Sequence, residues 1–219
     1  MISPFIMDAL ANPTRWAEFR IGGWSSAYSR GFFPTQPMAL KSTIFKVQLS
    51  ISDMDRHYYA EHNLTLARHP SETDQRLMVR LLAFALYADE RLEFGKGLST
   101  TEEPALWLRE YDGSIRLWIE VGLPDERVLR KAAGRAEQVV VLLYGGRVAD
   151  MWWAKEGLGL ARLGNLKVLN LAEEQTAAMV ELAERGMQLQ CTIQDGQVYL
   201  TDGPQTVLIE PRCLMPVES

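Results

Sequence analysis

The chain has 219 residues, of which 47% are hydrophobic and 23% charged, and its formal net charge is −5 at pH 7. This composition is typical of a globular protein long enough to bury a sizeable core. No apolar run approaches the roughly 18 residues that span a bilayer, so we expect no membrane helix, and the acidic balance argues against a general polyanion binder. Two cysteines, Cys191 and Cys213, lack metal-ligand spacing, so we expect a cytoplasmic protein with reduced thiols.

Residues 1–37 differ from the rest of the chain. Their aromatic residues are scattered among serine, glycine and proline with no sustained period of 2 or 3.6. At Met38 the sequence changes to an alternating, β-branched segment. We therefore expect 1–37 to be an irregular extension, either disordered or upstream of the true start, and 38–219 to form a single domain. A functional N-terminal arm is the competing interpretation.

The domain opens with a predicted strand near 40–53 and an antiparallel partner at 58–66. A helix follows, with Ser71 as its N-cap and Asp74 at the capping-box position. The later predictions are a hairpin at 104–122, a helix from Pro124, a buried strand at 138–144, a helix near 148–156, a strand at 167–171, a helix at 173–185, a hairpin of 188–192 with 198–200 that turns at Asp195-Gly196, and a strand at 206–210. This order predicts an α/β protein with a mixed central sheet flanked by helices.

The hairpin at 104–122 has two dissimilar faces. With Asp112-Gly113 as a two-residue turn, one face carries only aliphatic side chains. The other face carries carboxylate, guanidinium and aromatic groups, namely Glu103, Trp107, Arg109, Tyr111, Arg116, Trp118 and Glu120. The assignment of faces depends on the register, because a slip of one residue exchanges them.

Glu103 and Glu120 are diagonal neighbours on this face, roughly 7–8 Å apart at Cα. Two carboxylates at this spacing can converge on one divalent cation, and Mg²⁺ is typically held by one or two carboxylates with water and phosphate. The alternative is an amphipathic hairpin whose outer face forms ion pairs or packs beneath a helix.

Two helices carry charged stripes. Glu72, Arg76 and Arg80 lie four residues apart on the first helix, a spacing typical of weak surface salt bridges. On the helix after the hairpin, Lys131 is predicted to point back toward Glu120, where it would steady a phosphate or a water. The alternative is that its charge complements the carboxyl end of that helix.

Five stretches carry a resemblance to a known family. They are MALKSTI at 38–44, LTLARHPSET at 64–73, YADERL at 87–92, LWIEVGLPDER at 117–127 and TIQDG at 192–196. In this order they resemble the YaeQ family, a bacterial family of undetermined function, over about 38–212. The resemblance implies a fold similar to that of the PD-(D/E)XK nucleases, in which acidic residues on a hairpin bind Mg²⁺.

The motif of these nucleases is an acid followed, on the next strand, by acid-X-Lys. On this resemblance Glu120 is the second acid and Glu103 the best candidate for the first, with Asp112 as a rival in the predicted turn. Glu72 fits the place of a further acid on the first helix. The sequence departs from the motif at Gly122, which stands in the lysine position, and Lys131 is the candidate replacement.

Two hypotheses follow, and the sequence leaves open whether the protein is an enzyme. The first is a Mg²⁺-dependent phosphodiesterase or nuclease, in which Glu103 and Glu120 hold the metal, Glu72 assists and Lys131 contacts the scissile phosphate. In this hypothesis Arg109 and Arg116 would contact the nucleic-acid backbone, and Trp107 and Trp118 would stack on bases. The second is a non-catalytic, nucleic-acid-associated or regulatory binding module on the same fold, since a fold does not imply its commonest activity.

Overall fold

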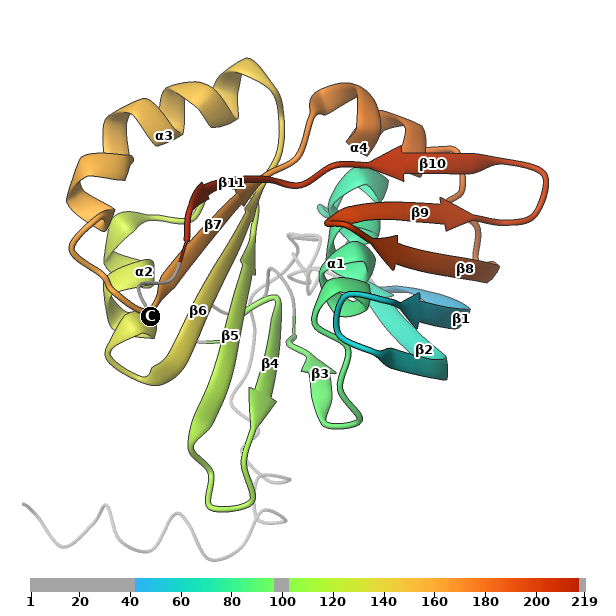
Figure 1. Ribbon diagram of the computed structural model, residues 1–219, viewed down its shortest axis with the longest axis horizontal. Helices are drawn as coiled ribbons and strands as arrows, with labels where there is room; N and C mark the ends of the chain where they lie inside the picture. Colours follow the sequence, from blue (N-terminus) through green and yellow to red (C-terminus); the bar gives the residue numbers. More distant parts are fainter. Residues whose placement is uncertain (1–41, 97–102, 217–219) are drawn as a thin grey trace, which may run out of the picture. The chain divides into compact units, whose positions relative to one another are not determined.

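The computed structural model describes residues 42–96 and 103–216, and the predicted extension at 1–37 lies outside these ranges. The described part is an α/β structure with two mixed sheets and four helices (Figure 1). Sheet A, in the order β10-β9-β8-β1-β2, consists of β1 (Thr43–Asp53), β2 (Tyr58–Arg68), β8 (Gly186–Gln194), β9 (Gln197–Thr201) and β10 (Thr206–Ile209). Sheet B, in the order β11-β7-β6-β5-β4-β3, consists of β3 (Leu92–Phe94), β4 (Leu106–Arg109), β5 (Ile115–Val121), β6 (Ala136–Leu143), β7 (Leu166–Asn170) and β11 (Arg212–Met215).

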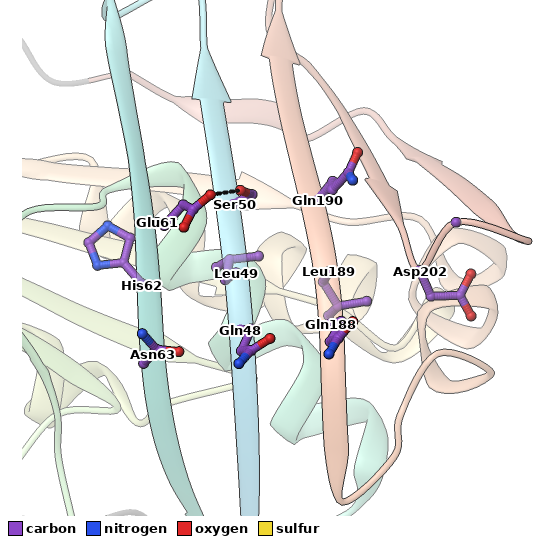
Figure 2. A pocket seen from close by; sticks show the side chains of 11 residues that line it. Gln48, Leu49, Ser50, Glu61, His62, Asn63, Gln188, Leu189, Gln190 and Asp202 are labelled. Carbon is purple, nitrogen blue, oxygen red and sulfur yellow. Dashed lines mark hydrogen bonds between the residues drawn. The ribbon is translucent and has the colours of Figure 1, made fainter.

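The strands of sheet A alternate between core and solvent. On β1, Val47, Leu49 and Ile51 are 1–2% exposed, and the residues between them point outward. β1 pairs antiparallel with β2, as predicted, and parallel with the distant strand β8. The outer face of the sheet is polar, and Figure 2 shows Gln48, Asn63 and the other side chains that line a shallow pocket on it.

Helix α1 (Asp74–Leu86) lies between the two sheets (Figure 1). Every residue from Leu77 to Ala85 is buried, because one core cluster joins the helix to the inner faces of both sheets. A surface helix would bury only one stripe. Because the helix is buried on all sides, a charged residue in its middle, such as Arg80, is buried as well.

The helix begins two residues later than predicted. Thr73 is the N-cap, and its Oγ1 accepts a hydrogen bond from the Arg76 backbone N–H at 3.1 Å. The assignment of Ser71 as N-cap is wrong, because its hydroxyl lies 2.6 Å from His69 Nδ1 instead. Ser71 thus belongs to the turn before the helix. This turn is closed by a hydrogen bond of 2.8 Å from the Glu72 N–H to the His69 carbonyl.

Sheet B contains the parallel strands β5, β6 and β7. Helices α2 (Glu126–Ala133) and α3 (Arg147–Leu160) connect them and cover the face opposite α1, where a second core cluster forms (Figure 1). The apolar run of β6 is buried on both faces, as predicted, with Val139 to Leu143 all 0% exposed. Helix α4 (Glu173–Val180) packs against α1 and β10. No helix in the described ranges is long and apolar enough to cross a bilayer.

The hairpin β4–β5 has the predicted register and a different turn. Trp107 pairs with Trp118, and its neighbours follow that register. The loop has three residues, since the Gly113 N–H donates to the Glu110 carbonyl at 3.0 Å and Gly113 has φ 87°. A two-residue Asp-Gly turn would also need a positive φ at Asp112, which that residue does not adopt. In consequence Arg109 pairs with Ile115, whereas a two-residue turn at Asp112-Gly113 would pair it with Arg116.

The expected mixed sheet flanked by helices corresponds to sheet B. The sequence did not indicate a second sheet, because local alternation does not show which strands lie beside the terminal hairpins. These hairpins form sheet A, since β1 and β8 pair with each other. Strands β3 and β11 were also missed, and their three and four residues are too few to show an alternating pattern.

Candidate functional site

Charged and polar side chains gather where β5 and β6 end and α1 begins. We call this group the strand-end cluster: Glu72, Arg76, Arg80, Glu120 and Tyr144. Carboxyl ends of adjacent parallel strands are a common location for ligand sites, because loops and helix termini meet there. The cluster combines two carboxylates, two guanidinium groups and a phenol.

Glu72 is 4% exposed and fully engaged by arginine. Arg80 Nη1 donates to both Glu72 carboxylate oxygens at 3.1 Å, and Arg76 Nη1 donates to Oε1 at 3.0 Å. Arg80 is itself 1% exposed. The prediction of weak surface salt bridges along this stripe is therefore wrong, because both sheets cover the helix.

Glu120 lies half-buried near the end of β5. Its Oε1 accepts a hydrogen bond from Trp118 Nε1 at 2.9 Å. Burial raises the pKa of the Glu120 carboxyl, while the Trp118 bond and the Arg76 charge act in the opposite direction. The Arg76 guanidinium is thus bonded to one carboxylate and within electrostatic reach of the other.

Tyr144 follows β6 and packs beside Gly122. A Cβ on Gly122 would lie 3.7 Å from Tyr144 Cε1 and 4.0 Å from its hydroxyl oxygen. Burial raises the pKa of the Tyr144 phenol, and Glu72 raises it further, whereas Arg76 lowers it. A phenol therefore occupies the space beside Gly122.

Glu103 belongs to different surroundings. Its Oε1 accepts a hydrogen bond from Lys96 Nζ at 2.9 Å, and this interaction, with the backbone N–H of Lys96, holds the pKa of the Glu103 carboxyl below its usual range. Glu120 has Trp118 and Arg76 as its neighbours. The structure thus gives the two predicted metal ligands separate partners.

The predicted Mg²⁺ ligands do not fit a metal site as they are arranged here. Within residues 42–96 and 103–216, no three histidine, cysteine, aspartate or glutamate side chains are grouped so that they could hold an ion. Glu72 is neutralised by two arginines, and Glu103 by Lys96. Lys131 is exposed on α2 and has no hydrogen bond or ion pair with another described residue, and its predicted role at a phosphate beside Glu120 stays a prediction.

The mixed face of the hairpin forms a second group, which we call the arginine–tryptophan ladder: Arg109, Trp107, Trp118 and Arg135. The Arg109 guanidinium lies 4.3 Å from the centre of the Trp107 ring, and that of Arg135 lies 5.7 Å from the centre of Trp118. The two indoles contact edge to face, with 6.2 Å between ring centres. Two guanidinium groups and two indoles are therefore in contact over one hairpin face, with Arg135 contributed by the segment between α2 and β6.

Exposure differs along the ladder. Trp118 is 2% exposed and belongs to the core under α2, so its predicted role in stacking a base is not available to it. Trp107 is half-buried. The side chains of Arg109 and Arg116 are 47% and 57% exposed, and carboxylates face both, Glu93 at 2.7 Å and Glu110 at 3.8 Å.

The sequence analysis missed three residues of these groups. Arg76 was noted only in a surface stripe, and Arg135 was not singled out. Tyr144 could have been found, because a Tyr-Gly-Gly sequence directly follows a buried strand, where parallel sheets place their functional loops.

Comparison with known proteins identifies the family. A model of the family described as YaeQ protein matches residues 38–211. The chain is 47% identical over 173 residues to the uncharacterized protein YaeQ of Salmonella typhi, covering 79% of this chain and 96% of that protein. It is 48% identical over 165 residues to uncharacterized YaeQ of Escherichia coli K12, covering 75% and 91%.

Two crystal structures have the same fold. YaeQ protein from Xanthomonas axonopodis pv. citri matches with a TM-score of 0.78 and 50% identity, over 80% of this chain and 98% of that one. YaeQ protein from Pseudomonas syringae matches with a TM-score of 0.76 and 35% identity, over 80% and 97%. The chain therefore belongs to the YaeQ family.

Proposed function

We propose that the protein is a non-catalytic module that binds single-stranded nucleic acid on the face of the β4–β5 hairpin. The observation that carries the proposal is the arginine–tryptophan ladder. Stacked guanidinium groups keep their N–H donors in the plane of the group, free to reach phosphate oxygens, and single strands are commonly held by aromatic stacking beside basic side chains.

The arginines of this face already have carboxylate neighbours. Arg109 is paired with the exposed Glu93, while Arg116 lies 3.8 Å from Glu110, which is bonded to Arg91, so a phosphate would displace Glu93 or bind the remaining N–H donors. Arg135 is exposed and its guanidinium lies over the Trp118 ring, which adds a cationic group to this surface. In this proposal Trp107 stacks on a base, and the buried Trp118 supports it from the side.

The strand-end cluster favours binding without hydrolysis over catalysis. Its Glu72 carboxylate is neutralised by arginine, and Gly122 lacks a side chain that could stabilise charge on a phosphate.

The test is the affinity for labelled single-stranded DNA and RNA, measured by fluorescence anisotropy at low and at physiological salt. We expect Trp107→Leu to weaken binding about five- to a hundredfold, as the loss of one stacked base predicts, and Arg109→Gln to weaken it and reduce its salt dependence. Arg185→Gln is the matched control, because it removes an exposed arginine outside the ladder. Equal affinities of all four proteins, or no binding by the unaltered chain at low salt, would refute the proposal.

A Mg²⁺-dependent phosphodiesterase on a variation of the PD-(D/E)XK fold is the second candidate. One observation favours it: Glu120 lies half-buried near the end of β5 and forms no salt bridge with another described residue, so its carboxylate is not neutralised as those of Glu72 and Glu103 are. Calorimetry with Mg²⁺ and Mn²⁺ tests this candidate. Binding heat that disappears in Glu120→Gln would support it, and the absence of heat at millimolar metal in both proteins would exclude it.

A further inference from the structure

Strand β2 forms one edge of sheet A and is unusually long for an edge strand. It pairs with β1 through eleven consecutive residues with no bulge, and no other described strand pairs with it. Figure 2 shows Glu61, His62 and Asn63 on β2, beside β1. The backbone groups along its outer side thus have no strand partner within the described ranges.

The other three sheet edges are short. Strands β3, β10 and β11 have three, four and four residues. Short edges, prolines, bulges and charged residues are the usual protection against pairing with another chain. Strand β2 has eleven residues, no proline and no bulge, and its charged residues are Glu61 and Arg68, of which Arg68 is already paired with Asp74.

The inner side of β2 is incompletely covered. Tyr58, His62 and Leu64 on this side are half-buried, whereas the inner residues of the neighbouring strand β1 are buried. These side chains pack against the main core cluster or bond to each other, with Tyr58 Oη and His62 Nε2 2.8 Å apart. A further strand beside β2 would cover them.

We propose that β2 pairs antiparallel with β2 of a second copy of this chain, around a two-fold axis at Asn63. Asn63 is the midpoint of the strand, so this register uses its whole length. On the outer face it places Tyr59 opposite Ala67 and Glu61 opposite Thr65, and on the inner face His62 opposite Leu64, so no like charges lie opposite each other. Two five-stranded sheets become one continuous sheet whose polar outer faces lie on the same side.

Cysteine cross-linking tests the register. In a Cys213→Ser background, which removes the exposed thiol and leaves the buried Cys191, Asn63→Cys places two sulfurs across the axis. Directly opposite Cβ atoms lie about 4.5–5.5 Å apart, so mild oxidation should give a covalent dimer. Gln48→Cys is the matched control, because Gln48 is the β1 residue opposite Asn63 and its two copies would be about 14 Å apart.

Charge variants test the interface in solution by light scattering after size exclusion. Thr65→Glu places a second carboxylate opposite Glu61 at two symmetric positions, and we expect dimerisation to weaken about tenfold. Adding Glu61→Lys should restore the dimer through two Lys–Glu pairs, an outcome that a folding defect would not produce. A monomeric unaltered chain at about 100 µM, or equal cross-linking at positions 48 and 63, would overturn the proposal.

Discussion

The Tyr144 ring lies against Gly122, with Tyr144 Cε1 3.7 Å from the position of a Cβ at that glycine. Gly122 has φ 98°, a conformation that disfavours any other residue. The backbone at this position therefore favours glycine, and the Tyr144 phenol lies at ordinary contact distance beside it.

Gly122→Ala should lower the free energy of unfolding by about 1–3 kcal/mol, because the φ value is strained for alanine while the contact with Tyr144 is an ordinary one. Gly122→Lys should cost at least as much and should create no phosphodiesterase activity. Urea unfolding measures both. Gly134→Ala is the control: this helix cap has φ −81° and room for a Cβ, so no comparable loss is expected. A Gly122→Ala protein as stable as the unaltered chain would contradict the assignment of strain.

Removing the Glu72 carboxylate should destabilise the protein strongly. In Glu72→Gln the buried Arg80 charge loses its partner, which typically costs about 3–5 kcal/mol. Glu126→Gln removes the partner of Arg130 in an exposed pair on α2, and there we expect a loss of about 0.3–0.5 kcal/mol. Chemical denaturation of both variants provides the comparison. Similar losses would mean that Glu72 and Arg80 are more hydrated than their burial indicates.

Glu120 should make stability depend on pH. Its pKa is raised in the folded state above the ordinary value of 4.5. At a pH between 4.5 and the raised pKa of the folded state, the folded protein holds a proton that the unfolded chain has released. The free energy of unfolding therefore falls as the pH rises through this range. Glu120→Gln removes this contribution. Unfolding measured from about pH 4 to 7 should therefore show the variant gaining stability relative to the unaltered protein as pH increases, and parallel curves would argue against a raised pKa.

The start of α1 can be tested by two similar substitutions. Thr73→Ala removes the side-chain cap of the Arg76 N–H and should cost about 1 kcal/mol. Ser71→Ala removes a hydroxyl that contacts His69 in the preceding turn, and we expect a smaller loss. Thermal or urea unfolding distinguishes them, and a larger effect at Ser71 would restore the N-cap assigned from the sequence.

The local elements could be predicted from the sequence by itself. Alternation along 43–53 predicted which side chains of β1 face the core. The pairing of Trp107 with Trp118 is the one that a two-residue turn predicts, because an irregularity between Leu108 and Arg109 offsets the longer loop. At Asp195-Gly196 both residues adopt positive φ, as the two-residue turn requires. These features depend on neighbours a few residues apart, whose geometry the backbone periods determine.

Only the tertiary structure decided the surroundings of the candidate site. Glu72, Arg76 and Arg80 have the same spacing on an exposed helix as on a buried one, so their burial followed from the placement of α1 between two sheets. That placement depends on the parallel pairing of β1 with β8, which are far apart in the chain. Local pattern cannot specify such a pairing, because it depends on how the whole core packs. For the same reason the sequence identified Glu103, Glu120 and Lys131 as chemically suitable, whereas the fold gave the two glutamates different partners and left Lys131 exposed.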